Sequence, residues 1–201
     1  MTTTWISEDG EPVSKKISFF GWVLLFSRGS AIIFIIVFGL LLKFLLRVFE
    51  KPLFGDMRPV SPQITVMVSK ISLWLLSIPV IRFGAPLKQP GAFVANHSSW
   101  LDIFALNSGQ SLYFVSKSEV ASWPGIGFLA KVTGTLFIRR ESKEAVAQKK
   151  LFGQRIKMGH RLLFFPEGTS TDGMRVLPFK SALFQAFFDS GLNSPCYIQP
   201  V

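Results

Sequence analysis

GAFVANHSSWLD, residues 91–102, joins an apolar run to one of the chain's two histidines and then to an amphipathic run. The apolar run is typical of a buried strand, and Ser98 or Ser99 is a suitable N-cap for a helix running through Leu106. A strand that leads directly into a helix is the repeating unit of α/β folds. His97 would then lie at the carboxyl end of the strand, where open α/β sheets bind their ligands.

The same alternation continues through the rest of the chain. Five runs bounded by Gly, Pro, Ser or Asn predict strands, at residues 91–97, 111–117, 134–140, 161–167 and 195–201. Helices are expected between them, at 98–107, around 124–132, at 142–158 with Gly159 as its stop, and at 178–190 with Gly191. The pattern predicts an α/β fold with a mostly parallel sheet flanked by helices.

The N-terminal part of the chain has a different character. Residues 1–16 form a polar tail, and residues 17–49 are strongly apolar, with no charge at all between residues 31 and 42. A helix over about residues 29–49 would be roughly 30 Å long, which matches the thickness of a bilayer core. We therefore expect this segment to anchor the protein in a membrane.

A second apolar stretch, residues 66–81, is interrupted by Lys70 and stopped by Pro79. It is too short and polar to span a membrane alone, and an interfacial or packing helix is expected. Two arrangements remain open, a single spanning helix or a helical hairpin lying in one leaflet. The expected domains are the tail, the membrane-associated segment to residue 83, and a catalytic domain over 84–201.

The composition favours membranes and anionic partners. Hydrophobic residues make up 49% of the 201 residues, and the formal net charge is +10. Residues 131–180 hold 11 of the 22 Lys and Arg against four acids. Such a face favours lipid headgroups, a phosphorylated substrate or an acidic carrier. No nucleic-acid-binding motif accompanies the charge, so no nucleic acid is expected as a partner. The single cysteine excludes an intramolecular disulfide and fits a reducing, cytoplasmic location.

His97 and Asp102 are the candidate catalytic pair. If His97 lies just before the helix, the carboxylate of Asp102 can reach back to its imidazole. Asp102 would fix the tautomer, and the other ring nitrogen would act as a general base. A structural histidine is the alternative interpretation of this stretch. The other histidine, His160, is expected to be an ordinary loop residue, and with only two imidazoles no metal site is expected.

Two further motifs end strands at the same predicted edge of the sheet. RLLFFPEGTSTDG (161–173) brings Glu167 and a flexible glycine turn to that edge, although a simple strand-to-turn transition would look similar. GTLFIRR (134–140) ends in Arg139 and Arg140, which can bind a phosphate or carboxylate in bidentate fashion. Adjacent arginines can also be just a solvated edge.

In this order, His-x4-Asp, Gly-x-x-Phe-Ile-x-Arg and Phe-Pro-Glu-Gly-Thr resemble the glycerolipid acyltransferase family, over roughly residues 85–201. The resemblance implies that His97 deprotonates an acceptor hydroxyl with Asp102 as its partner. The hydroxyl then attacks the thioester of acyl-CoA or acyl-carrier protein directly, with no cofactor and no metal. The residues that would bind substrate are Arg140 with Arg139, Glu167, Gly168, Thr169, Lys117 and Lys180.

The family's best-known members acylate lysophosphatidic acid, so 1-acylglycerol-3-phosphate is the expected acceptor and phosphatidic acid the product. The arginine usual after Glu-Gly-Thr is Ser170 here. Either Arg175 or Lys180 replaces its phosphate contact, or the acceptor carries no phosphomonoester. The STDG sequence looks closer to bacterial members that acylate lyso-ornithine lipid, which is the alternative acceptor. A non-catalytic lipid-binding protein on the same scaffold is the third possibility.

The resemblance also bears on location and on the extent of the chain. We expect a cytoplasmic (inner) membrane location with the catalytic domain on the cytoplasmic side, among membrane lipids, the lysolipid acceptor and the acyl donor. Family members usually continue past the position of Val201. The sequence is therefore expected either to be truncated at Val201 or to complete its sheet in a different way.

Overall fold

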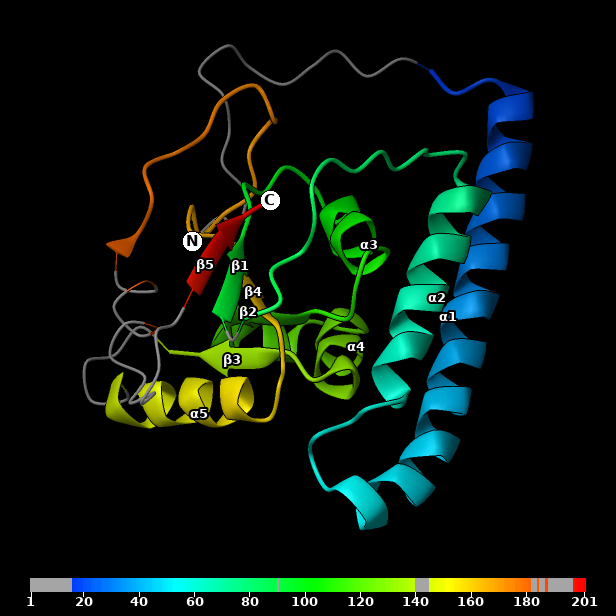
Figure 1. Cartoon of the computed structure of the whole chain (residues 1–201). Helices are drawn as coiled ribbons and strands as arrows, with labels where there is room; N and C mark the ends of the chain where they lie inside the picture. The colour runs from blue at the N-terminus through cyan, green and yellow to red at the C-terminus, as the bar shows by residue number, and fades with distance from the viewer. Residues whose placement is uncertain (1–15, 90, 140–144, 182–183, 185–186, 188–196) are drawn as a thin grey trace. The chain divides into compact units, whose positions relative to one another are not determined.

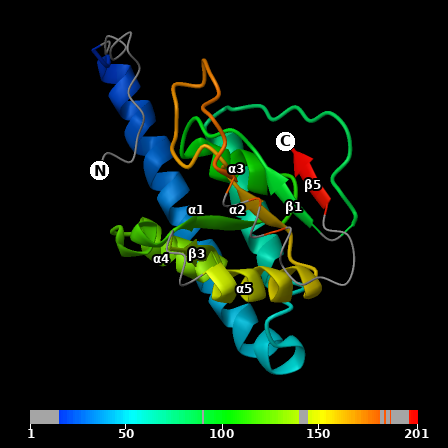
Figure 2. The same ribbon diagram turned by 90° about the vertical axis from the view of Figure 1, so that its left-hand side faces the viewer.

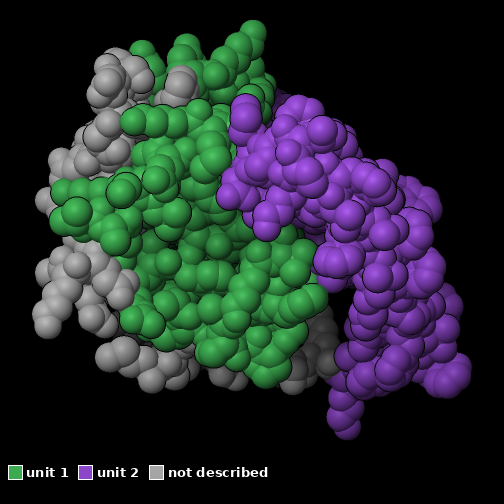
Figure 3. All heavy atoms as spheres, turned by 90° about the horizontal axis from the view of Figure 1, so that it is seen from below, with its two compact units in different colours: residues 1, 84–98, 112–201 green, residues 2–83, 99–111 purple. Residues whose placement is uncertain are grey.

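The computed structural model describes residues 16–89, 91–139, 145–181, 184, 187 and 197–201. The chain forms two compact units, coloured separately in Figure 3. The sheet unit comprises Gly84–Ser98 and Leu112–Val201, and the helix unit comprises Thr2–Phe83 and Ser99–Ser111.

The sheet unit is built on a parallel sheet, which has five strands in the described residues (Figure 1). The strands run in the order β3-β2-β4-β1-β5, and every pairing is parallel. All carboxyl ends therefore lie at one edge, as the alternating sequence pattern predicts. The strands are β1 (Gly91–Val94), β2 (Tyr113–Lys117), β3 (Leu136–Ile138), β4 (Leu162–Phe164) and β5 (Tyr197–Pro200).

One cluster of buried apolar side chains in this unit lies on one face of the sheet. Alternate strand residues such as Ala92, Val94, Leu162 and Phe164 point to this face and are buried. Helix α5 (Ala145–Lys157) runs along the sheet in Figures 1 and 2 and contributes buried residues to the same cluster. Each large apolar side chain buried in this way contributes about 2 kcal/mol to stability.

Glycines end both described helices that join strands in this unit. After the short 3-10 helix η1 (Ser118–Ser122), α4 (Ile126–Thr133) ends at Gly134, whose φ of 87° is left-handed. The stop predicted at Gly159 after α5 is confirmed, with a φ of 77°. Glycine suits these positions because it adopts positive φ without steric cost. Gly191 lies outside the described residues.

The helix unit contains α1 (Phe19–Phe54), α2 (Ser61–Leu75) and α3 (Leu101–Asn107) in its described part. At 36 residues, α1 extends beyond the predicted 29–49 at both ends. Helix α2 begins earlier than the stretch expected at residues 66–81. Pro62 falls in its first turn, where proline is tolerated. The chain then leaves the helix before Ser77, whose φ of 57° is left-handed.

Helices α1 and α2 pack together as a hairpin. A Cβ on Gly39 would clash with Cγ2 of Val68, so glycine at this position permits the close approach of the two helices. Beside this contact, the buried ammonium of Lys43 donates to Oγ1 of Thr65 at 2.9 Å. The hairpin confirms that the second apolar stretch forms a packing helix. In the described part of the chain, α1 is also the one helix long and apolar enough to cross a membrane.

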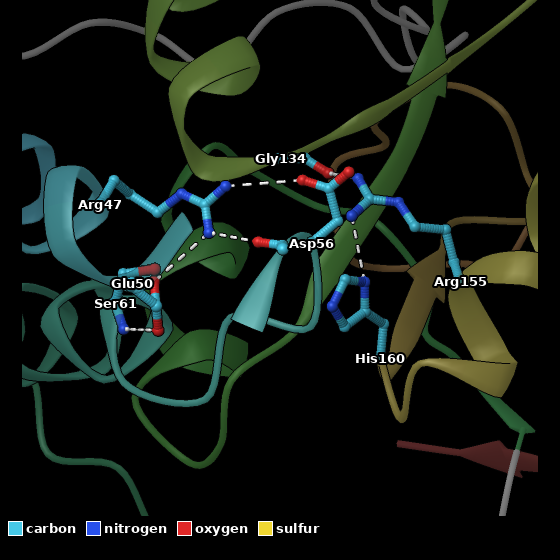
Figure 4. Close-up of polar contacts among 8 residues, drawn as sticks. Arg47, Glu50, Asp56, Ser61, Gly134, Arg155 and His160 are labelled. Carbon is cyan, nitrogen blue, oxygen red and sulfur yellow. Dashed lines mark hydrogen bonds and ion pairs between the residues drawn. The ribbon is translucent and has the colours of Figure 1, made fainter. Parts of the chain in front are cut away.

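The loop of the hairpin is held by charged residues near the end of α1, shown in Figure 4. Oε1 of Glu50 accepts hydrogen bonds from the backbone N–H groups of Val60 at 2.7 Å and Ser61 at 3.0 Å. Arg47 donates to the carbonyl of Gly55 at 3.0 Å and lies 3.5 Å from both Glu50 and Asp56. Glu50 thereby satisfies N–H groups at the start of α2 that no helical bond can satisfy.

Candidate active site

His97 lies three residues beyond the carboxyl end of β1, in irregular backbone. Its side chain is half-buried, and its ring stacks on Phe165 with a centroid distance of 4.0 Å and an interplanar angle of 14°. Phe165 follows β4, the neighbour of β1, and its ring stacks in turn on Phe114 of β2 at 6.0 Å. The imidazole is thus placed at the carboxyl edge of the sheet, as predicted from the strand pattern.

The backbone of His97 is held on both sides by the segment that follows β4. Its N–H donates to Oε1 of Glu167 at 2.8 Å. Its carbonyl accepts from the backbone N–H of Thr171 at 2.8 Å, and Oγ1 of Thr171 is 3.3 Å away. The Phe-Pro-Glu-Gly-Thr motif and the following residues therefore fix the position of the histidine.

Glu167 is 1% exposed, and both of its carboxylate oxygens accept backbone hydrogen bonds. Oε2 accepts from the N–H of Leu177 at 2.8 Å, while Oε1 accepts from His97. A tight turn presents the carboxylate, since the N–H of Gly168 donates to the carbonyl of Phe165 at 3.0 Å. Burial of a carboxylate is costly unless hydrogen bonds compensate it, and these N–H groups do so. Its predicted contact with the acceptor remains a prediction.

The loop beyond Glu167 folds back over the residue that follows His97. Oγ1 of Thr171 accepts from the N–H of Gly173 at 3.2 Å, and Oδ1 of Asp172 accepts from that of Met174 at 2.9 Å. A Cβ on Gly173 would lie 3.4 Å from Cβ of Ser98. The STDG sequence thus forms a compact turn against Ser98.

The other predicted substrate-binding residues of this unit also follow strand ends or the motif turn. Lys117 ends β2 and is half-buried, and Arg139 follows β3 and is exposed. Gly168 and Thr169 are half-buried in the motif turn. Lys180 has an exposed side chain, and its backbone N–H donates to the carbonyl of Pro166 at 3.0 Å. Arg140 lies outside the described residues. Their contacts with substrate remain predictions.

Asp102 belongs to the helix unit, in the first turn of α3. Its Oδ2 accepts from the N–H of Ser99 at 3.0 Å, and Oγ of Ser99 accepts from the N–H of Leu101 at 3.0 Å. The predicted N-cap at Ser98 or Ser99 is wrong, because the N-cap residue of α3 is Trp100, whose side chain makes no cap hydrogen bond; Oγ of Ser99 still accepts from the first N–H of the helix. Because His97 and Asp102 fall in different units, their pairing remains a prediction.

The sequence pattern missed two features of the sheet unit. The N–H of Thr171 donates to the carbonyl of His97. No sequence feature indicates this role, apart from the position of Thr171 just after the Glu-Gly-Thr motif. His160 is not an ordinary loop residue: it is 5% exposed, and its ring stacks on Tyr113 with a centroid distance of 4.2 Å. Among the described residues, no group of three or more His, Cys, Asp or Glu is arranged to hold a metal ion.

Comparison with known proteins gives the family and the fold. The family model described as Acyltransferase matches residues 79–201. The chain is 49% identical over 197 residues to the lyso-ornithine lipid O-acyltransferase of Rhodobacter capsulatus, an alignment covering 98% of this chain and 71% of the relative. It is 39% identical over 109 residues to the 1-acyl-sn-glycerol-3-phosphate acyltransferase of Neisseria gonorrhoeae, covering 53% of this chain and 43% of the relative.

The fold has a counterpart among solved structures. The crystal structure of the 1-acyl-sn-glycerophosphate (LPA) acyltransferase PlsC from Thermotoga maritima superposes with a TM-score of 0.61 and covers 89% of this chain and 72% of that chain. The two sequences are 21% identical, so this likeness concerns the fold alone. It confirms the predicted parallel sheet flanked by helices.

Proposed function

Because this chain belongs to the acyltransferase family, we propose that it transfers a fatty acyl chain from a thioester donor to the hydroxyl of lyso-ornithine lipid. The observation that carries the choice of acceptor is the 49% identity, over nearly the whole chain, to an enzyme named for that lipid. The sequence motifs leave lyso-ornithine lipid as the alternative acceptor to lysophosphatidic acid, and the relatives favour lyso-ornithine lipid. The donor is acyl-CoA or acyl-carrier protein, and no cofactor takes part.

His97 is the general base in this proposal. A ring nitrogen takes the proton of the acceptor hydroxyl while the oxygen attacks the thioester carbonyl, so a C–O bond forms. The C–S bond then breaks, and the departing thiolate takes the proton from the imidazolium. Asp102 is proposed to orient the ring and to stabilise its charged form. Such a base contributes about 10²–10⁴-fold to the rate.

Ser170 supports the ornithine acceptor. It occupies the position at which the family usually places an arginine, so the described turn offers a neutral hydroxyl there. An ornithine headgroup carries a carboxylate and an ammonium but no phosphomonoester, and it needs no dianion-binding arginine at this point. Exposed cations remain for its carboxylate, with Arg139 beyond β3 and Arg175 in the loop beyond Ser170.

Lysophosphatidic acid is the second candidate acceptor. A relative named for that substrate is 39% identical over about half of this chain, across the region that contains the motifs. Arg175 and Lys180 are exposed cations of the same unit that a phosphate could use. The two candidates share the base and the acyl donor and differ in the headgroup alone.

Membrane attachment through the helix unit completes the proposal. Apolar side chains are exposed along much of α1, and the membrane supplies the apolar contact that they lack in this structure. A long-chain lysolipid is itself held in a bilayer, so an enzyme acting on it must reach the headgroup plane. The proposed location is the cytoplasmic membrane, with the sheet unit on the cytoplasmic side.

The test uses the purified full chain in vesicles, with lyso-ornithine lipid and 1-acylglycerol-3-phosphate offered in parallel. Labelled acyl-CoA and acyl-carrier protein serve as donors. We expect faster turnover of lyso-ornithine lipid, and we expect His97→Ala to lower kcat by about 10²–10⁴-fold. Val146→Ser, at an exposed position on α5, is the control for the substitution itself.

The outcomes separate the alternatives. Normal turnover by His97→Ala would remove the proposed mechanism. Preference for 1-acylglycerol-3-phosphate would favour the second acceptor. Binding of a lysolipid without turnover, with either donor, would indicate a non-catalytic lipid-binding protein.

A further inference from the structure

We infer that Thr171 is a positioning residue for catalysis, which acts by fixing the backbone of His97 through its hydroxyl group and its N–H. This inference rests on the proposed role of His97 as the base. It adds a residue outside the Phe-Pro-Glu-Gly-Thr motif to the groups on which the reaction depends.

The segment that carries His97 has an irregular conformation. Residues 95–99 lie in neither a helix nor a strand, so no regular ladder of hydrogen bonds sets their path. The position of the imidazole therefore depends on specific contacts to the peptide groups on each side of the His97 Cα. Glu167 holds the N–H side at 2.8 Å, and Thr171 holds the carbonyl side at 2.8 Å through its own N–H.

The hydroxyl of Thr171 makes further hydrogen bonds to this segment and to the following turn. Oγ1 lies 3.3 Å from the carbonyl oxygen of His97 and 3.4 Å from that of Arg175, so its one proton is shared between these acceptors. As an acceptor, it takes the N–H of Gly173 at 3.2 Å. The hydroxyl thus connects the carbonyl of His97 to the turn that ends at Arg175, and this turn also packs on Ser98.

Thr171 acts through His97 and not on the substrate. Its residue surface is 6% exposed, so the side chain is enclosed by the protein. A shift of about 1 Å in a catalytic group can lower a rate by as much as about 10²-fold. A change that loosens only one of several anchors is expected to cost less, about tenfold in kcat.

The test compares Thr171→Val with Thr171→Ser in the full chain. Valine keeps the volume and the branching at Cβ but removes the hydroxyl, whereas serine keeps the hydroxyl. Thr133→Val is the matched control, because the Thr133 hydroxyl is also partly buried and bonds within α4, to the carbonyl of Leu129 at 2.8 Å. We expect Thr171→Val to lower kcat about tenfold with KM changed less than about twofold. Thr171→Ser and Thr133→Val should stay within about twofold of the original kcat.

A second readout is independent of activity. The chain has two histidines, so the imidazole 15N resonances of His97 and His160 can be followed separately. We expect Thr171→Val to move the His97 resonances and to leave those of His160 in place, whereas general unfolding would move both. If the valine variant does not fold, Thr171→Ala replaces it under the same criteria.

The inference is overturned if Thr171→Val retains the original kcat, if its effect falls on KM alone, if serine fails to restore the rate, or if the His97 resonances do not move. These results differ from a failure of the proposed function. In that case the unaltered chain shows no acyl transfer, or His97→Ala turns over normally, whatever residue 171 is.

Discussion

Arg155 links three parts of the sheet unit through one guanidinium group, as Figure 4 shows in part. It donates to the carbonyl of Gly134 at 2.8 Å, contacts Nδ1 of His160 at 3.0 Å, and lies 5.2 Å from the ring centre of Tyr113. A guanidinium group can only donate, so Nδ1 of His160 is the acceptor in this contact. His160 therefore has a structural role.

Replacement of Arg155 by methionine tests this network. The variant leaves the carbonyl of Gly134 and Nδ1 of His160 without the guanidinium donor, and it loses the cation–π contact. We expect the free energy of unfolding to fall by about 2–3 kcal/mol. Denaturant unfolding of the detergent-solubilised chain, followed by the fluorescence of its tryptophans, measures the change. Gln154→Met, at an exposed neighbouring position on α5, should leave stability within about 0.5 kcal/mol. Equal stability of both variants would contradict the structural role.

Ser170 offers a prediction about specificity at the same scale. Ser170→Arg restores the arginine that the family usually carries at this position. A guanidinium group there favours a phosphomonoester through bidentate hydrogen bonds. We expect the ratio of kcat/KM for 1-acylglycerol-3-phosphate to that for lyso-ornithine lipid to rise at least about tenfold. Ser170→Gln, which has comparable length and no charge, is the control, and an unchanged ratio in the arginine variant would separate residue 170 from headgroup choice.

At the scale of secondary structure, Glu50 shows how one helix begins another. The N-cap residue of α2, Val60, has no side chain that can accept a hydrogen bond, and the carboxylate of Glu50 from α1 takes that place. Glu50→Ala would leave the N–H groups of Val60 and Ser61 without this acceptor. We expect a loss of about 1–3 kcal/mol, measured as a lower midpoint of helix unfolding by circular dichroism in detergent. Glu50→Gln keeps an acceptor oxygen and should lose less, and equal losses in the two variants would contradict a hydrogen-bonding role.

The elements of the sheet unit could be predicted from sequence because their signals are local. Short, largely apolar runs bounded by Gly, Pro, Ser or Asn give β1 to β5, and a glycine in the left-handed region ends α5 where the sequence indicated. The start of α2 could not be predicted as well, because the capping carboxylate comes from Glu50, ten residues earlier and on a different helix. Local sequence patterns do not predict contacts between residues on different helices.

The same distinction applies to the candidate site. His97 and Glu167 were found because each lies in a compact motif at the end of a predicted strand. The hydrogen bond that joins them spans 70 positions and exists because β1 and β4 are neighbours in the sheet. The roles of Thr171 and His160 depend entirely on the tertiary structure, so their contacts could not be predicted from their residue types alone.

At the scale of the whole molecule, α1 predicts attachment to membranes. Phe34, Phe38 and Leu41 follow one another at helical spacing and are 67%, 54% and 60% exposed. We expect their joint replacement by serine to lower the vesicle-bound fraction, measured by flotation, because each buried apolar side chain contributes about 2 kcal/mol to partition. Val146→Ser on α5 should leave flotation unchanged. Unaltered flotation of the triple variant would exclude this face of α1 as the anchor.

The pairing order of the strands has a consequence for synthesis on the ribosome. β1 lies between β4 and β5, which begin only at Leu162 and Tyr197. A nascent chain that has completed residue 94 therefore carries an apolar strand with both edges open, and one edge stays open until the segment from Tyr197 emerges. Unpaired strand edges readily recruit other chains. Slow or interrupted translation between these strands would consequently expose the cell to aggregation of this protein.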